Sequence, residues 1–441
     1  MIRAVLNLTL IVTLMASVRT FLPALDESVA GAGVALGFGF LLLAAWQTGQ
    51  LFSMLRLPRL TGYLLTGIVC GPEVSGMLTT QMIDSLGIVN GVAVGLIALS
   101  AGSELNFVHI RPRFRSIVAV SLIAIPLAMF GTALVAFLLA GRLPFMHGMT
   151  SMQRIVTAAT LGVVFASLSP AVAIAMISET SSAGPVSETV LGVVVIADIA
   201  IILLFATMHA VAQGQFATGA PGGSISSFTG VVIEVFGSMI AGVVVSGVLA
   251  LYLRRVQAKA SLFVLAVCFI CAEIGTRLHL DVLLICLTAG LLLENVLGVK
   301  GENVARELAP VSLPIFAVFF GVAGAKLHIH DLKVVWPYAL LFVAVRAIGH
   351  AAGAKIGSAV GRADPVVRKW LPMGMIPQAG VSVGLAVLIA RHFPSWGPQA
   401  RALILGVITI NELVGPVLLR TALVRAGEAG KRVAVPAAQP H

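Results

Sequence analysis

Long apolar runs recur along the whole chain, and they restrict the fold more than any other feature of the sequence. Fourteen such segments are separated by shorter polar connections. A run of roughly 17–25 apolar residues is long enough to cross the hydrocarbon core of a bilayer as a helix. Only 10% of the residues are charged, far fewer than a soluble domain needs for its surface. We therefore expect an all-α polytopic membrane protein with 13–14 transmembrane helices.

The first predicted segment, within residues 1–22, is read either as a cleaved signal or as an extra span. The membrane domain is expected to cover residues 30–423, followed by a short tail at 424–441. The approximate limits of the fourteen segments are 4–20, 31–55, 60–78, 86–104, 116–140, 154–178, 186–212, 228–252, 260–277, 281–297, 310–327, 334–357, 370–390 and 400–420.

Lys and Arg residues are distributed unequally between the two sets of connections. The connections after even-numbered segments, together with the tail, hold seventeen, and those after odd-numbered segments hold eight. Because the cytoplasmic loops of membrane proteins are richer in Lys and Arg, we expect a cytoplasmic C-terminus. The same bias accounts for the net charge of +10, so we expect no nucleic-acid partner.

Two distant stretches share one pattern. In GPVSETVLGVVVIADIAIILL and GPQARALILGVITINELVGPVLL, a Gly-Pro pair precedes a polar patch, Leu-Gly, an aliphatic run and an acid. When one residue is inserted, Ala197–Asp198 align with Asn411–Glu412. The copies are seven segments apart, and an odd offset inverts the second copy across the membrane. Inverted repeats, here about 56–212 and 260–423, are typical of secondary transporters with a site near the bilayer midplane.

Each acid-bearing segment follows a span with a proline in its middle, Pro170 in the first copy and Pro377 in the second. Proline has no N–H and clashes with the carbonyl four residues earlier, so Pro170 should free the carbonyl of Ala166. Freed backbone oxygens at membrane depth must line a cavity or bind a ligand, and a dehydrated cation suits them. A kink tolerated by neighbouring helices is the alternative. The polar and small residues near the two prolines are Ser167, Ser169, Gln378, Gly380 and Ser382.

Asp198 is the single carboxylate in the apolar run GVVVIADIAIILLFA. A charge at the bilayer midplane costs at least ~3 kcal/mol, so such residues usually mark ion pathways. Desolvation favours the protonated acid, whereas a nearby Arg346 would favour the carboxylate, so a proton and a cation can compete for it. A packing acid paired with Arg346 is the structural alternative. An intramembrane aspartyl protease is disfavoured, because Asp281 lies at a tight bend rather than within a span.

Several blocks, taken in order, resemble the monovalent cation:proton antiporters, which include bacterial sodium/proton antiporters and potassium-efflux relatives. The similarity extends from about Leu55 to Leu423. It implies the sodium/proton antiporter fold with two crossing broken helices, a homodimer in a bacterial inner membrane, no cofactor and no enzymatic activity. The blocks are LRLPRLTGYLLTGIVCGPEVSG (55–76), LIALSAGSELNF (96–107), LTAGLLLENV (287–296) and PIFAVFFGVAGAKLHI (314–329).

The resemblance also assigns roles to individual residues. The family's transport carboxylate lies at the position of Asp198, and its preceding acidic or neutral polar residue is Ala197 here. A single titrating acid favours exchange of one proton for one monovalent cation. The family's basic residue before the second broken helix matches Arg346, which we expect to offset buried negative charge. The family's Pro-Arg-Gly-Glu type motif is PQAG here, without either charge. Asn411 and Glu412 are secondary candidates.

The sequence thus predicts a secondary active transporter that exchanges H⁺ for Na⁺ or K⁺, electroneutrally, by alternating access around Asp198. A cation channel, a potassium-efflux system and a proton-coupled exchanger of another small ion are the alternatives. A channel would pass current without moving protons, whereas an electroneutral exchanger moves protons without current. Among the other acids, Glu179 and Glu188 are read either as solvated helix ends or as residues that attract cations to an entrance. Glu273 lies inside a predicted span, where it either faces the transport cavity or has no role in transport.

Overall fold

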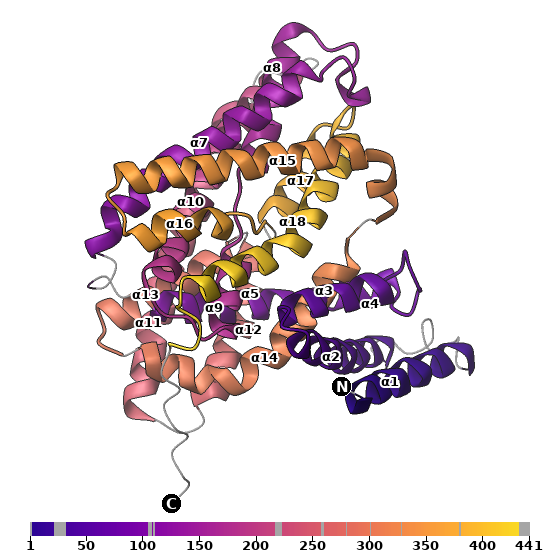
Figure 1. Cartoon of the computed structure of the whole chain (residues 1–441), viewed down its shortest axis with the longest axis vertical. Coiled ribbons are helices and arrows are strands. Elements are labelled where there is room, and N and C mark those ends of the chain that lie inside the picture. The colour runs from indigo at the N-terminus through magenta and orange to yellow at the C-terminus, as the bar shows by residue number, and fades with distance from the viewer. Residues whose placement is uncertain are drawn as a thin grey trace, which may run out of the picture.

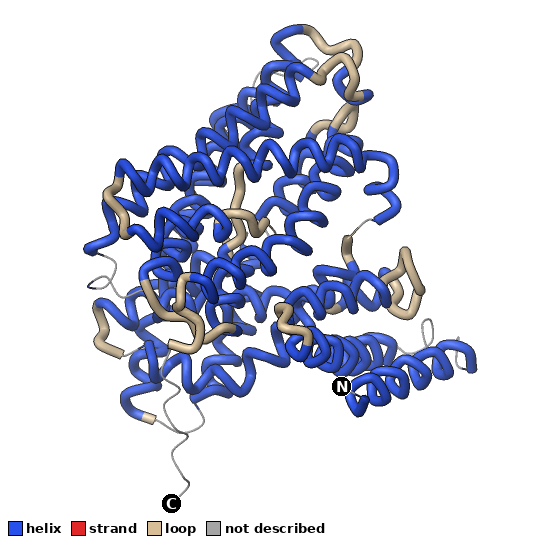
Figure 2. Tube along the Cα trace, viewed as in Figure 1, coloured by secondary structure: helices blue, strands red, loops and turns tan. Residues whose placement is uncertain are grey.

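The computed structural model describes residues 2–21, 32–104, 108, 111–216, 223–256, 260–278, 280–299, 301–327, 329–378 and 381–431. Across these residues the regular elements are helices and there is no strand (Figure 1, Figure 2). The α-helices are α1 (Ile2–Phe21), α2 (Ala32–Met54), α3 (Arg59–Cys70), α4 (Thr80–Ser85), α5 (Gly87–Glu104), α7 (Phe114–Leu138), α8 (Ser151–Phe165), α9 (Pro170–Glu179), α10 (Pro185–Phe216), α11 (Gly223–Arg255), α12 (Ala260–Leu278), α13 (Val282–Asn295), α14 (Gly301–Ala325), α15 (Ile329–Val360), α16 (Pro365–Gly374), α17 (Val381–His392) and α18 (Gly397–Arg425). Short 3-10 helices, η2 (Arg111–Arg113) and η3 (Pro144–Met146), precede α7 and α8.

The apolar segments predicted from the sequence all correspond to helices. Seven helical stretches of the described chain are long and apolar enough to cross a membrane, and seven shorter apolar helices accompany them. This agreement confirms the predicted all-α membrane fold. The helix α3 ends at Cys70, earlier than the predicted limit at residue 78, because Gly71 and Pro72 follow it. The residue before a proline disfavours helical geometry, and proline has no N–H with which to extend a helix.

The helices form two groups, and in Figure 1 helices α7, α8, α15, α16 and α17 lie above α2, α3, α12 and α14. Helices α7–α10 pack with α15–α18 in one group, here called the crossing group, and α1–α5 pack with α11–α14 in the flanking group. The stretch Ser151–Glu179 contains α8 and α9, and an 18-residue apolar part of it is 100% buried. The corresponding part of Phe236–Arg255 in α11 is only 28% buried. The α8–α9 segment therefore lies at the centre of the protein, and α11 lies at its periphery.

A row of glycines brings two long helices of the crossing group together. Gly349, Gly353 and Gly357 follow one face of α15 at four-residue spacing. A Cβ atom at any of these three positions would lie 2.3–2.7 Å from a Cα atom of α7, where no side chain fits. Such rows of small residues allow helix backbones to approach closely in membranes, where lipid removes most of the hydrophobic drive to associate.

The flanking group contains two helix pairs that the predicted inverted repeat relates to each other, α3 with α14 and α13 with α5. Gly67 of α3 lies against the backbone of Gly321 in α14, and a Cβ at Gly67 would be 1.9 Å from that carbonyl oxygen. Gly102 of α5 lies in the same way against Leu287 of α13, at 2.2 Å. Both copies therefore use the same close glycine contact between corresponding helices.

Candidate ion-binding site

Both predicted broken helices are present, and each consists of two half-helices. Residues 166–169 separate α8 from α9, and α16 likewise ends before Pro377, which precedes α17. Pro170 is the first residue of α9 rather than a kink within a continuous helix. This position suits proline, because the first helical residue has no intrahelical partner for an N–H. Gly380, a predicted site residue, lies outside the described residues.

The two breaks contact each other directly. The backbone N–H of Ser169 donates to the carbonyl of Pro377 at 3.1 Å. The Ser169 side chain also caps α9 by accepting from the Val172 N–H. The hydroxyls of Ser167 and Ser382 are 2.5 Å apart, which links the first break to the start of α17. Ser167 and Ser169, singled out from the sequence, thus lie where the broken helices cross.

Gln378 adds a second set of bonds across the crossing. Its amide nitrogen donates to the carbonyl of Val164 at 3.1 Å and to the hydroxyl of Ser167 at 3.2 Å. Its amide oxygen accepts from the amide nitrogen of Asn411 at 2.8 Å. Gln378 is fully buried, so these bonds satisfy its donor and acceptor groups in the absence of water. Pro377 and Gln378 of the PQAG sequence therefore form a hydrogen-bonded junction between the two repeats.

Arg346, on α15, is fully buried and binds both breaks. Its three guanidinium nitrogens donate to the carbonyls of Phe165 and Ser167, each at 2.7 Å, and of Ile376 at 2.8 Å. These oxygens lie at the C-terminal ends of α8 and α16, where helix dipoles concentrate partial negative charge. The sequence predicts that Arg346 offsets buried negative charge, and its hydrogen-bonded partners are backbone carbonyls rather than a carboxylate. The breaks free these carbonyls, and the planar guanidinium holds them in one arrangement.

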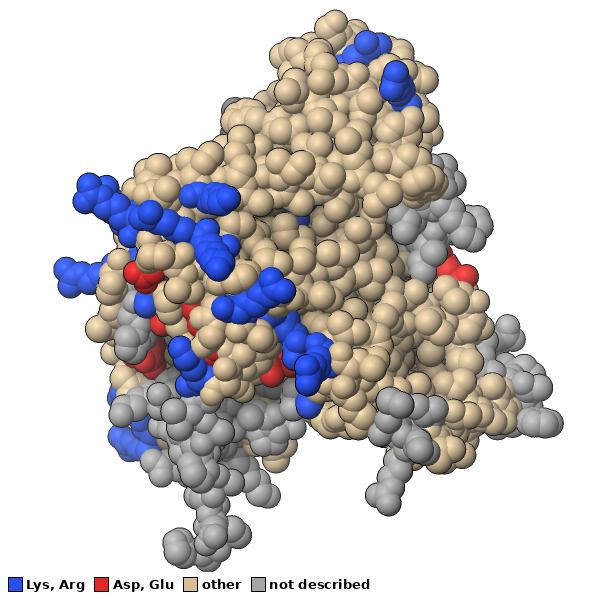
Figure 3. Space-filling model, in the orientation of Figure 1, with Lys and Arg blue, Asp and Glu red and all other residues tan. Residues whose placement is uncertain are grey.

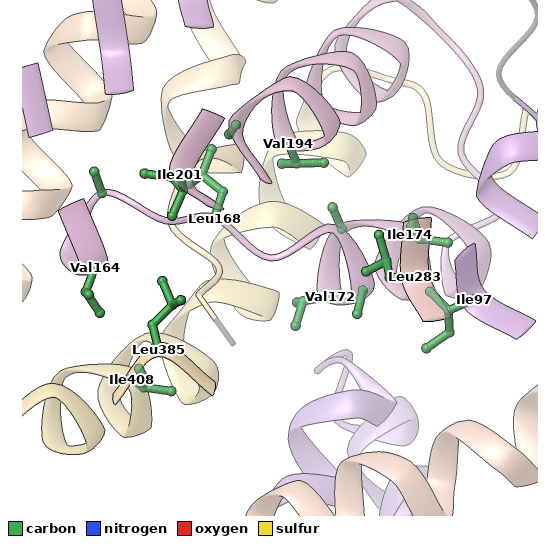
Figure 4. Packing of buried hydrophobic residues seen from close by; sticks show 14 of the residues in the cluster. Ile97, Val164, Leu168, Val172, Ile174, Val194, Ile201, Leu283, Leu385 and Ile408 are labelled. Atoms are coloured by element: carbon green, nitrogen blue, oxygen red, sulfur yellow. The ribbon is translucent and has the colours of Figure 1, made fainter. Parts of the chain in front are cut away.

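Asp198 is 3% exposed, and neither of its carboxylate oxygens has a hydrogen-bond partner among the described residues. Ile201, one helical turn after Asp198 on α10, lies beside Leu168 of the first break (Figure 4). The same face of α10 therefore presents Asp198 toward the crossing. No ion pair with Arg346 is found, because the arginine binds carbonyls instead. An uncompensated buried carboxylate is costly, so the ionised form of Asp198 is disfavoured where it stands.

Asp281 is a second, partly buried acid close to Asp198 in the fold. It lies at the N-cap of α13, where one carboxylate oxygen accepts the N–H groups of Leu283 at 2.7 Å and Leu284 at 3.2 Å. Sequence reasoning placed Asp281 at a bend and gave it no further role. An acid immediately before an apolar run is the usual N-cap signal, and it would have predicted the helix start but not the proximity to Asp198.

The second acid of the repeat, Glu412, is also buried, at 4% exposure. Its neighbour Asn411 is fully buried and is bonded to Gln378. Both residues lie on the α18 face that contacts the second break, as the alignment with Ala197–Asp198 suggests. The sequence therefore located two acids that the fold places beside two corresponding helix interruptions.

Three other acids have structural partners. Glu179, at the end of α9, accepts the N–H of Arg59 at 2.6 Å and of Leu60 at 3.4 Å, and so caps α3. Glu188 forms an ion pair with Arg113. Glu273 pairs with Arg277 one turn later, and both side chains are largely exposed. Glu179 is neither a solvated helix end nor a free acid, because it joins the crossing group to the flanking group.

Comparison with known proteins identifies the family. Residues 38–425 match the family model described as "Sodium/hydrogen exchanger, transmembrane". The chain belongs to this family. The predicted resemblance to cation:proton antiporters is confirmed, and the exchanger is a multi-pass integral membrane protein of a family that exchanges cations for protons. No curated protein sequence matches the chain.

Solved structures show the same fold. The sodium proton antiporter MjNhaP1 from Methanocaldococcus jannaschii at pH 8 superposes with a TM-score of 0.68 at 13% sequence identity, covering 91% of the exchanger and 99% of MjNhaP1. A second structure of MjNhaP1, from an electron microscopy map, also gives a TM-score of 0.68, at 14% identity, with 88% and 96% of the two chains covered. At these identities the likeness concerns the fold, and it confirms the predicted antiporter architecture.

Proposed function

We propose that the exchanger moves H⁺ and a monovalent cation, Na⁺ or K⁺, in opposite directions, one for one, with Asp198 as the shared ligand. The observation that carries this proposal is the burial of Asp198 without a hydrogen bond or an ion pair. A proton or a monovalent cation restores neutrality there, and binding of one excludes the other. We take the crossing group to move across the membrane only when Asp198 is neutralised by a bound proton or cation. Each movement then carries one ligand, and the group cannot move back while the carboxylate is charged and empty. Exchange without leak follows from charge alone.

The surroundings of Asp198 suit a dehydrated cation. Ser167 and Ser169 place hydroxyl and backbone oxygens at the break that Asp198 faces. Hard monovalent and divalent cations prefer such oxygen ligands. Arg346 is engaged by three backbone carbonyls and so does not compete for the carboxylate. We assign it the role of fixing the crossing geometry.

Alternating access requires the crossing group to move against the flanking group. Two contacts join the groups at one end of the molecule. Glu179 caps α3, and Arg420 of α18 donates to the carbonyl of Arg56 at 2.7 Å. We propose that this end faces the cytoplasm, because Lys and Arg gather around it, at the left and lower left of Figure 3. Movement between the groups must break these bonds. A homodimer in a bacterial inner membrane, which the resemblance implies, stays a prediction.

Transport in proteoliposomes tests the proposal. Protein is reconstituted, an outward or inward gradient of Na⁺ or K⁺ is imposed, and internal pH is followed with a dye while a second dye follows membrane potential. Wild type should form a pH gradient without net current, and Asp198→Asn should not. The matched control is Glu273→Gln, which removes an exposed acid of a surface ion pair and should transport normally. Full exchange by Asp198→Asn would end the proposal, and current without proton movement would identify a channel instead.

A further inference from the structure

Glu412 has the same relation to the second break that Asp198 has to the first. A Cβ atom on Gly415, one turn after Glu412, would lie 2.7 Å from the Cα of Pro377. Ile408, one turn before it, lies beside Leu385 of α17 (Figure 4). The face of α18 that carries Glu412 is therefore packed against the α16–α17 break. A buried acid in the middle of a span is costly.

Two oxygen atoms at this place have no donor. Oε2 of Glu412 and Oδ1 of Asn411 are buried, and neither has a hydrogen-bond partner among the described residues. The nitrogen of Asn411 is already bonded to Gln378, so the amide orientation that makes this bond leaves Oδ1 free. A buried acceptor without a donor is destabilising, and an unpartnered carboxylate is more so. A pair of oxygens from adjacent residues, one of them acidic, has the composition of a monovalent-cation site.

This second place is connected to the first break by side chains. Asn411 donates to Gln378, and Gln378 donates to the hydroxyl of Ser167, which lies 2.5 Å from that of Ser382. Arg346 binds carbonyls of both breaks. Hydrogen bonds therefore join Asn411, the neighbour of Glu412, to the first break within the crossing group.

We propose that Glu412 and the Oδ1 atom of Asn411 form a second binding site for a monovalent cation, related to the Asp198 site by the inverted repeat. The proposal rests on cation exchange at Asp198 and extends it to a second ligand set. A carboxylate with one bound monovalent cation is neutral, so an occupied second site adds no net charge to the moving helices. Exchange therefore stays electroneutral while each protein chain holds up to two cations.

Thermal stability of the purified full chain in detergent provides a test, because a ligand that binds only the folded state raises the unfolding temperature. NaCl and KCl are compared with choline chloride at equal ionic strength. The variants are Asp198→Asn, Glu412→Gln, the double variant, and Glu273→Gln as the control. We expect each single variant to keep part of the cation-specific rise in unfolding temperature, the double variant to lose it, and the control to match wild type.

The outcomes separate the two proposals. Loss of the whole cation effect in Asp198→Asn would overturn the second site and leave the function at Asp198 intact. If Asp198→Asn shows the same cation-specific rise in unfolding temperature as wild type and also exchanges normally, the proposed function itself is refuted. Because Glu412→Gln can fail to fold, the Asp198→Asn protein is also imaged with Tl⁺, a heavy monovalent cation. Density for Tl⁺ between Glu412 and Asn411 supports the second site, and its absence at saturating Tl⁺ refutes it.

Discussion

Replacement of Arg346 by lysine tests the idea that a planar guanidinium joins the two breaks. Lysine keeps the positive charge and most of the length, so the cost of burying a charge is retained. It offers its donors from a single nitrogen, whereas the arginine donates from three nitrogens to carbonyls of Phe165, Ser167 and Ile376. One ammonium cannot reach all three oxygens, which belong to two different broken helices.

The magnitude follows from the bonds lost. A hydrogen bond from a charged group contributes about 1.5–3 kcal/mol, so the loss of at least one bond should destabilise the protein by at least that amount. The assay is thermal unfolding of the purified protein, followed by intrinsic fluorescence, under identical detergent conditions. Lys355→Gln is the control, since Lys355 is an exposed charge on the same helix. If Arg346→Lys unfolds at the temperature of wild type and the control, the guanidinium does not hold the crossing together.

Two further substitutions test contacts at the ends of the crossing group. Glu428 is 1% exposed and accepts the N–H groups of Val186 at 2.6 Å and Ser187 at 2.8 Å, so Glu428→Gln should weaken the start of α10 by about 1–3 kcal/mol. Faster hydrogen–deuterium exchange in peptides over the first turn of α10 is expected, and unchanged exchange would refute the cap. Glu179→Gln should lower the stability of the α3 start by about 0.5–2 kcal/mol and increase exchange at Arg59 and Leu60. Protection equal to wild type there would show that Glu179 does not join the two helix groups.

The fold could be predicted largely because membrane physics leaves few choices. Apolar length fixed the spans, and the odd offset between the two acid-bearing segments fixed the inverted repeat. Proline marked both breaks, although Pro170 begins a half-helix instead of bending a continuous one. The glycine row at Gly349, Gly353 and Gly357 would have predicted a close helix contact, but not that α7 is the partner. Partner identity depends on the packing of the whole bundle.

The acids of the site could be predicted from the sequence, but the groups that surround them could not. An acid in an apolar run is visible in the sequence, which is why Asp198 and Glu412 were found. The partners of Arg346 are backbone carbonyls, which every residue has, so no side-chain pattern could indicate them. Asp281 and Asp198 are far apart in the chain, and their proximity arises only when α13 packs in the bundle.

The claim that a proton and a monovalent cation occupy Asp198 in turn is tested most directly by the apparent KM for the transported cation as a function of pH. The measurement is made in proteoliposomes, with pH varied on the side from which the cation is taken up and the maximum rate recorded at each pH. Competition for one carboxylate predicts that KM rises about tenfold for each unit of acidification once the proton dominates, while the maximum rate stays constant. A KM that does not change with pH, together with a maximum rate that falls, would contradict a shared site at Asp198.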